Sequence, residues 1–177
     1  MQHQNLSPVL TLAEALAQRS DDAAIWQSVD RALADLYGHR LFTVLAFNRS
    51  AGVMQRLYSS RPDINPVGGM KRVTQSRWTE SVLVRGNGYL GSSAADLASV
   101  FSDHALLIRQ GLESVKNVSV RLDGEVVGSL NMLNKANYYD NFDFSEALIV
   151  AQLIAHRLRK RTDDLGKVLS LQGLESV

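Results

Sequence analysis

Cysteine is absent from this sequence of 177 residues. Its absence excludes disulfides, thiolate nucleophiles, zinc sites built on cysteine and thioether-linked chromophores. The sequence also lacks any apolar run near the roughly 20 residues that cross a bilayer. Its first residues have neither the basic start nor the long apolar core of a secretory signal. We therefore expect a cytoplasmic protein with no membrane association.

An excess of either charge is missing as well, because 19 basic residues stand against 18 acidic ones. No global field therefore draws the chain to nucleic acid or to a membrane surface. The basic cluster RLRKR at residues 157–161 is followed at once by Asp163 and Asp164, and we interpret it as a solvated helix face. We expect no direct binding of nucleic acid, and any anionic ligand must be met by local cations.

The chain is long enough for one globular domain, and 45% of its residues are apolar. Apolar spacings of three and four residues predict helices near residues 9–17 and 22–37 and a long closing helix from Ser145. Runs rich in β-branched and aromatic residues predict a strand from Leu41 and a hairpin partner for it. The segment at residues 61–72, with two prolines and a glycine pair, is expected to be a long loop.

Short helices are expected in the middle of the chain. Trp78 and Val82 stand at helical spacing before a glycine-rich stop, and Ser93 followed by Asp96 predicts a capping box. Asp103 is expected to cap a further short helix, HALLIRQ. A short strand, YLGSS, separates the first of these helices from the others.

Asp123-Gly124 between two β-rich runs is the strongest hairpin signal in the chain. A two-residue turn would pair Asn117 with Leu130 and Ser119 with Gly128, and these residues would share one face. Asn117 and Ser119 would then be small polar groups in an apolar setting with room above Gly128, as in a pocket floor. In the alternative, neighbouring backbone or water satisfies both side chains and they serve the structure alone. The sequence does not favour either interpretation.

His104 is the histidine that stands beside an acid, Asp103, and such a pair could orient an imidazole as a general base. No nucleophile stands at a recognisable elbow, so a helix cap is the preferred interpretation. No spacing of histidines and acids indicates a metal site. We therefore expect no catalysis, no metal and no cofactor beyond an unidentified small-molecule ligand.

The order of these elements resembles the GAF domain family. Asn134-Lys135, then Phe142 and Glu146, is similar to the Asn-Lys…Phe-x-x-x-Asp-Glu motif of cyclic-nucleotide-binding GAF domains. Glu146 stands where that motif has Asp, and Ala147 stands where it has Glu. The match therefore supports the fold more than that ligand. The stretch from Trp78 to the motif also resembles stand-alone bacterial GAF proteins.

The resemblance covers about residues 22–161 and implies an α+β, GAF-like (PAS-related) fold. It implies a central antiparallel sheet of five to six strands, with terminal helices on one face and a pocket formed by loops and short helices on the other. We divide the chain into an N-terminal helical extension (1–20), a GAF-like ligand-binding domain (21–162) and a tail of the last helix (163–177). The resemblance also implies an ion pair between Lys135 and Glu146, a structural latch worth about 0–1 kcal/mol.

We predict a sensory or regulatory module that binds a small molecule and signals through a helical homodimer to a separate output protein. The apolar stripe of the closing helix, which begins at Leu148, is the reason to expect a homodimer. The alternative is a protein-interaction or dimerisation scaffold whose vestigial pocket is filled by side chains such as Trp78, Met70 and Met132.

The ligand-binding residues that we expect combine apolar walls with a few polar groups. Arg77, near the glycine pair of the long loop, is the candidate for meeting an anionic ligand. The expected set is Tyr58, Arg77, Trp78, Tyr89, His104, Ile108, Asn117, Ser119 and Leu130.

Overall fold

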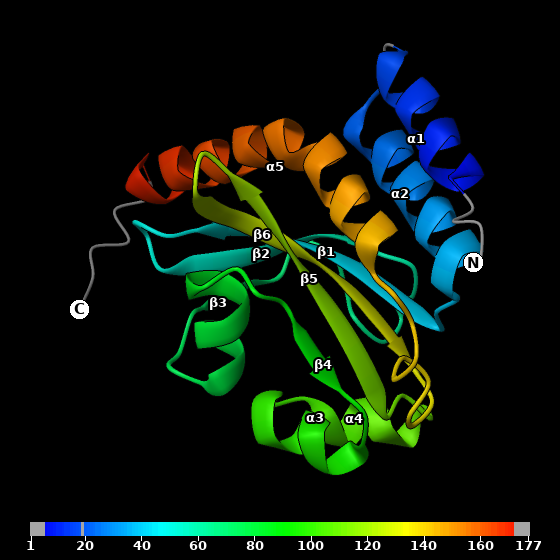
Figure 1. Cartoon of the computed structure of the whole chain (residues 1–177). Coiled ribbons are helices and arrows are strands. Elements are labelled where there is room, and N and C mark those ends of the chain that lie inside the picture. The colour runs from blue at the N-terminus through cyan, green and yellow to red at the C-terminus, as the bar shows by residue number, and fades with distance from the viewer. Residues whose placement is uncertain (1–5, 19, 172–177) are drawn as a thin grey trace.

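The structure, a computed structural model, describes residues 6–18 and 20–171. The ends of the predicted extension and tail, residues 1–5 and 172–177, lie outside the described residues, as does the side chain of Leu169. Figure 1 shows a single sheet between two sets of helices. The elements are α1 (Ser7–Ala17), α2 (Asp22–Tyr37), β1 (Leu41–Asn48), β2 (Val53–Ser59), β3 (Met70–Arg72), η1 (Thr79–Val84), β4 (Tyr89–Gly91), α3 (Ala94–Val100), α4 (His104–Arg109), β5 (Ser114–Leu122), β6 (Glu125–Asn134) and α5 (Ser145–Leu171).

The sheet has six antiparallel strands in the order β3-β2-β1-β6-β5-β4. This confirms the predicted α+β fold with five to six strands. The long loop at residues 61–72 differs from the prediction in one respect, because its last three residues form the edge strand β3. The loop therefore joins the sheet instead of lying outside it.

Local signals in the sequence set several element boundaries. Asp21 starts α2 by accepting a hydrogen bond from the backbone N–H of Ala24 at 2.8 Å, and Gly38 ends it with a φ of +67°. The predicted capping box of α3 is present, since Ser93 and Asp96 each accept from the other's backbone N–H. Asp103 precedes α4 but makes no side-chain cap hydrogen bond, so the cap predicted there is wrong.

The β5–β6 hairpin carries a β-bulge close to its turn. Arg121 pairs with Val126 as expected, but Val120 pairs with Gly128, which leaves Val127 as an extra residue in β6. A bulge shifts every later pair by one residue, and such a shift reverses the face on which a side chain lies. The predicted register is therefore wrong beyond the bulge.

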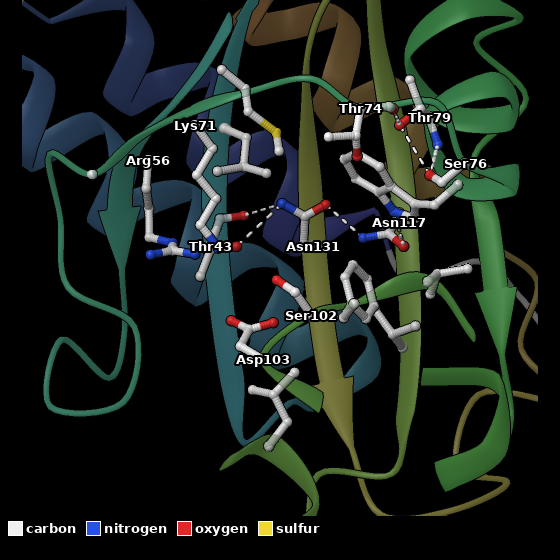
Figure 2. A pocket seen from close by; sticks show the side chains of 18 of the residues that line it. Thr43, Arg56, Lys71, Thr74, Ser76, Thr79, Ser102, Asp103, Asn117 and Asn131 are labelled. Atoms are coloured by element: carbon white, nitrogen blue, oxygen red, sulfur yellow. Dashed lines mark hydrogen bonds between the residues drawn. The ribbon is translucent and has the colours of Figure 1, made fainter. Parts of the chain in front are cut away.

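Asn117 consequently pairs with Asn131, and Ser119 pairs with Ser129. Figure 2 shows Asn117 and Asn131 side by side on the face of the sheet that η1, α3 and α4 cover. Leu130, which was predicted to share that face, is buried in the core on the other side. The polar floor that the sequence predicted is thus present with different partners.

Gly128 lies beneath α5. A Cβ at this position would lie 2.6 Å from Cδ2 of Leu158 and would also collide with the backbone carbonyl of Leu45. Glycine therefore permits the close approach of α5 to the sheet. The room predicted above Gly128 is occupied by the helix and is not part of a pocket.

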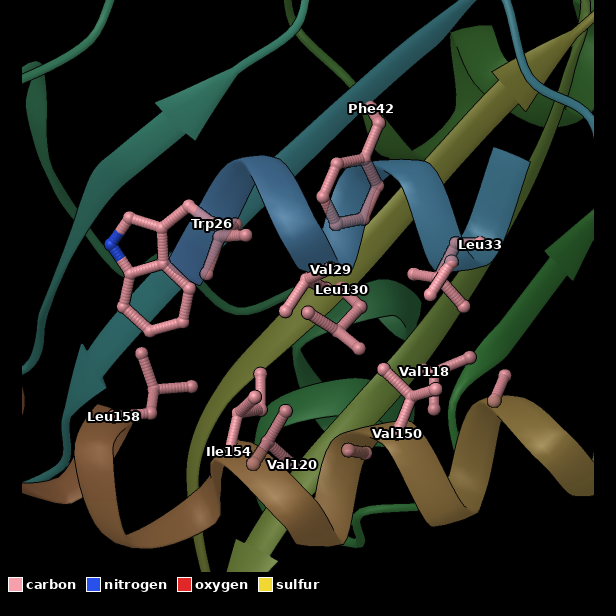
Figure 3. Packing of buried hydrophobic residues seen from close by; sticks show 14 of the residues in the cluster. Trp26, Val29, Leu33, Phe42, Val118, Val120, Leu130, Val150, Ile154 and Leu158 are labelled. Atoms are coloured by element: carbon pink, nitrogen blue, oxygen red, sulfur yellow. The ribbon is translucent and has the colours of Figure 1, made fainter. Parts of the chain in front are cut away.

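The main core lies between the sheet and the helices α2 and α5, as Figure 3 shows. Val29 and Leu33 of α2 and Ile154 and Leu158 of α5 are fully buried there. The apolar stripe predicted on α5 also packs here, so the chain's own sheet covers most of it and a partner chain is not needed for that purpose. Its buried members are Ala151, Ala155, Leu158, Thr162 and Leu165.

Helix α1 packs against α2 and α5. Its Val9 and Leu12 are buried and belong to the same apolar cluster as the residues of α2 and α5. The predicted extension therefore shares the core of the domain over its described residues.

Candidate functional site

A cavity of about 330 Å³ lies on the face of the sheet opposite α2 and α5. Its floor is formed by β1, β5 and β6. Its walls are formed by β2, by β3 and the loops on either side of it, by the start of η1 and by the segment between α3 and α4. The volume is at the low end of the range typical of small-molecule sites. The resemblance predicted a pocket on this face.

A chain of hydrogen bonds crosses the cavity floor. The indole Nε1 of Trp78 donates to Asn117 Oδ1 at 3.0 Å, and Asn117 Nδ2 donates to Asn131 Oδ1 at 2.6 Å. Asn131 Nδ2 donates to Thr43 Oγ1 at 3.1 Å, and the Ser129 hydroxyl donates to Asn131 Oδ1 at 3.0 Å. The floor therefore joins β1, β5, β6 and the segment before η1 through buried, satisfied polar groups, which fix its geometry.

Of the predicted ligand-binding residues, Trp78 and Asn117 line the cavity. Asn117 is 1% exposed and is bonded on both sides. Ser119 faces the same side of the sheet but donates to the carbonyl of Val82 at 2.7 Å and accepts from the N–H of Gly88 at 3.2 Å. The structure therefore favours the interpretation in which neighbouring backbone groups satisfy the hydrogen-bonding capacity of the Ser119 hydroxyl.

Tyr58 lies on the opposite face of the sheet because β2 also carries a bulge. Val44 pairs with Tyr58, whereas Leu45 pairs with Arg56, so Leu57 is an extra residue. The bulge interrupts the alternation of faces, which otherwise would place residues 56 and 58 on the same side. Tyr58 packs against the helix-covered core and donates to Asp30 Oδ2 at 2.6 Å, while Arg56 lines the cavity.

Four other predicted residues do not line this cavity. Arg77 is exposed outside it, and Tyr89 packs on the apolar residues beside it. His104 is held at the start of α4 by a 2.7 Å hydrogen bond between Nδ1 and the carbonyl of Phe101, and Ile108 is partly buried on the same helix. Asp103, the residue before His104, does line the cavity.

Three cationic residues of the cavity wall were missed by the sequence reasoning: Arg56, Lys71 and Arg72. Lys71 and Arg72 end the long loop segment at residues 61–72, shortly after the Gly68-Gly69 pair, so that segment was the available signal for them. Arg56 carried no such signal, because its direction depends on the bulge at Leu57. Burial lowers the pKa of the Arg56 guanidinium, and the charge of Asp103 acts in the opposite direction.

Two of the three side chains expected to fill a vestigial pocket lie outside the cavity. Met132 is fully buried on the helix-covered face of the sheet, and Met70 is 45% exposed. Trp78 forms part of the wall. The cavity is therefore open between its walls.

No protein-family model matches the sequence, and no curated protein matches it. Several solved structures do match this chain in fold. The GAF domain of a phosphoenolpyruvate-protein phosphotransferase (ptsP) from Coxiella burnetii gives a TM-score of 0.69 at 11% identity over 96% of each chain. The GAF domain of the Acinetobacter phosphoenolpyruvate-protein phosphotransferase gives 0.68 at 14% identity, covering 90% of this chain and 95% of that one. The GAF domain of a two-component sensor histidine kinase from Bacillus halodurans gives 0.61 at 15% identity, covering 82% and 98%.

The chain has the GAF-domain fold. The sheet order, the terminal helices on one face and the cavity on the other agree with this result.

Within this GAF fold, Lys135 and Glu146 do not form the predicted latch. Lys135 is exposed at the end of β6, and no ion pair joins it to Glu146 among the residues that the structure describes. Glu146 turns inward in the first turn of α5 and accepts a hydrogen bond from Tyr37 at 3.3 Å. The acid of the motif thus connects α5 to α2 and not to the last strand.

The three arginines of the basic cluster on α5 form ion pairs within the chain. Arg157 Nη1 lies 2.7 Å from Asp22 Oδ1, Arg161 also pairs with Asp22, and Arg159 Nη2 lies 2.8 Å from Glu125 Oε2. These arginines link α5 to α2 and to the β5–β6 turn. Their charges are therefore largely offset at short range.

The described residues hold neither a candidate metal site nor a candidate membrane span. Over residues 6–18 and 20–171, no group of three or more histidine, aspartate or glutamate side chains is placed to hold a metal ion. No helix in that part of the chain has the length and apolar character to span a bilayer.

Proposed function

We propose that this chain is a sensory or regulatory module that binds a small molecule in the cavity and passes the signal to a separate partner. The observation that carries the proposal is the cavity itself, with a satisfied polar floor, apolar walls and several cations. Sites for small molecules combine these features. The similarity to the GAF domain of a two-component sensor histidine kinase supports the sensory part of the proposal.

The position of the cavity supports a route for the signal. Its floor strands β1, β5 and β6 pack on their other face against α5. A ligand that binds one arrangement of the floor better than another shifts the population of helix arrangements. The terminal helices are the surface through which the module would meet a second copy or an output protein.

A thermal-shift screen tests the binding. The panel contains cyclic nucleotides, amino acids, purines, and small carboxylic and aromatic acids. A ligand at 100 times its Kd stabilises the fold by about 2.7 kcal/mol, which for a chain of this size raises the Tm by about 5–10 °C. The same ligand should give no shift with Ser102→Trp, which places an indole at the exposed rim of the cavity.

Ser99→Trp is the matched control, because Ser99 is exposed on α3 and does not line the cavity. It should bind as the wild type does. If no member of the panel shifts the wild-type Tm, small-molecule sensing by this cavity fails, and the alternative of a dimerisation scaffold takes its place. If a ligand shifts the wild type and Ser102→Trp equally, it binds elsewhere.

A further inference from the structure

The charges on the cavity wall are unbalanced. Its lining includes Arg56, Lys71 and Arg72 but only one carboxylate, Asp103. No ion pair joins Asp103 to any of these cations within the described residues. The cavity therefore has a net positive wall in a protein with almost no net charge, and this local field favours an anion.

Arg56 is held in place yet has donor capacity left. Its Nη1 donates to the carbonyl of Pro66 at 3.0 Å, and its backbone is bonded on both sides to the loop, at Gly68 and Gly69. Its Nε is buried and has no hydrogen-bond partner in the described part of the chain. A buried N–H without a partner is uncommon, and a fixed guanidinium edge suits a planar, bidentate acceptor.

The remainder of the cavity is not charged. Figure 2 shows Arg56 and Lys71 at one side, Asn117, Thr74 and Ser76 at the opposite side, and Asn131 between them. Beyond the floor, the ring of Trp78 meets the ring of Phe101 edge to face, with centroids 6.0 Å apart, next to Leu107 and Val115. A ligand that fits both parts has an anionic end and an apolar, flat body.

We infer that the cavity binds a small aromatic monocarboxylate, with its carboxylate on the guanidinium of Arg56 beside Lys71 and its ring toward Trp78 and Phe101. The inference rests on the proposed function and names the ligand class of the same site. The volume of about 330 Å³ suits a compact ligand. Asp103 also lines the cavity and repels an anionic group that lies near it, which favours a ligand whose single charge is confined to the end that faces the cations.

Binding of matched pairs of acid and amide tests the charge. The probes are benzoate with benzamide, phenylacetate with phenylacetamide, and indole-3-acetate with indole-3-acetamide, titrated calorimetrically into the full chain. At least one acid should bind about tenfold tighter than its amide, since a hydrogen bond to an ionised group is stronger than one to a neutral group. Its affinity should fall at least about tenfold in Arg56→Met and less in Lys71→Gln, while the amide is unaffected.

Arg77→Met is the control, because Arg77 is exposed outside the cavity and should leave all affinities unchanged. Lys71→Gln keeps the inference testable if Arg56→Met fails to fold, since Lys71 is exposed. Acids that bind no better than their amides, or that are indifferent to both substitutions, overturn the inference. If none of the acids binds while a neutral or cationic member of the wider panel does, the inference fails and the sensory function stands. If nothing in the panel binds, both fail.

Discussion

The hydroxyl group of Tyr37 joins two elements that are far apart in the sequence. It donates to Glu146 Oε2 at 3.3 Å and accepts from the backbone N–H of Ala147 at 3.0 Å. That N–H is in the first turn of α5, where backbone donors have no partner inside the helix. Burial raises the pKa of Tyr37, and the carboxylate of Glu146 adds to the increase. The hydroxyl is therefore protonated at neutral pH, as its role as a donor requires.

Replacing Tyr37 with Phe should destabilise the fold by about 1–3 kcal/mol, because it leaves the buried N–H of Ala147 and the carboxylate of Glu146 without their partner. Urea unfolding followed by circular dichroism measures the change. Lys135→Ala removes the exposed cation of the predicted latch and should change stability by less than about 0.5 kcal/mol. A larger loss of stability in Lys135→Ala than in Tyr37→Phe would support an ion pair between Lys135 and Glu146 instead.

At the scale of elements, the sequence predicts the segments better than the faces that they present. Helical spacing, the Asp-Gly turn and the Ser93–Asp96 capping box correctly predict α2, the β5–β6 hairpin and α3. These signals are local, so the competing structures are few. The sequence also predicts Trp78 and Asn117 at the cavity.

The two bulges explain why the sequence misplaced Tyr58 and Leu130. One extra residue in β2 and one in β6 turn Tyr58 and Leu130 toward the helices and Arg56 and Asn131 toward the cavity. Neither bulge is marked by a glycine at its extra residue, which is Leu57 or Val127, and both are set by packing between layers. Alternation within a single strand does not contain that information.

Asp22 at the start of α2 connects that helix to α5 by accepting hydrogen bonds from Arg157 and Arg161. Partial burial would raise the pKa of Asp22, but the hydrogen bonds and charges of the two arginines outweigh it, so the net shift is below the ordinary value of 3.8. A carboxyl group whose folded pKa is lowered stabilises the fold above its unfolded pKa, and this contribution is lost as the pH falls through the folded value.

The wild type should therefore be more stable than Asp22→Asn at pH 7, and the difference should disappear as the pH falls through about 4 and below. Since Asp22 and its arginines are only partly buried and remain in contact with solvent, the difference at pH 7 should be about 1 kcal/mol or less. Urea midpoints of both proteins at pH 7, 5, 4 and 3 measure it. Glu14→Gln, a charge-matched change at an exposed position of α1, should match the wild type throughout. A difference between wild type and Asp22→Asn that persists at pH 3 would show that the arginine pairs are not its cause.

At the scale of the whole molecule, the sheet separates two layers. One face holds the cavity and the other holds the core beneath α2 and α5. Both layers share the same strands, because β1, β5 and β6 form the cavity floor on one face and contact α5 on the other. Since α5 covers the sheet with one side, its opposite side is the surface left for a partner.

The side of α5 that faces away from the sheet is apolar near the N-terminal end of the helix. Leu148, Ile149 and Leu153 of α5 are 59%, 44% and 38% exposed and lie within two turns of each other. The buried stripe of α5 gives no reason for a homodimer, but these exposed side chains do, because their burial between two copies would remove apolar surface from water. We predict a dimer of the full chain in size-exclusion chromatography with light scattering.

Leu148→Lys combined with Ile149→Lys should convert that dimer to a monomer, because two buried cations from each copy would be brought together without partners. The helix itself should persist, since both side chains point away from the sheet and lysine is a good helix former. Val84→Lys introduces a single lysine at an exposed valine of η1 on the other side of the sheet and should leave the dimer intact. A wild-type chain that is monomeric at all concentrations would contradict the prediction. A signal from the cavity would then have to leave through a different protein docked on this end of α5.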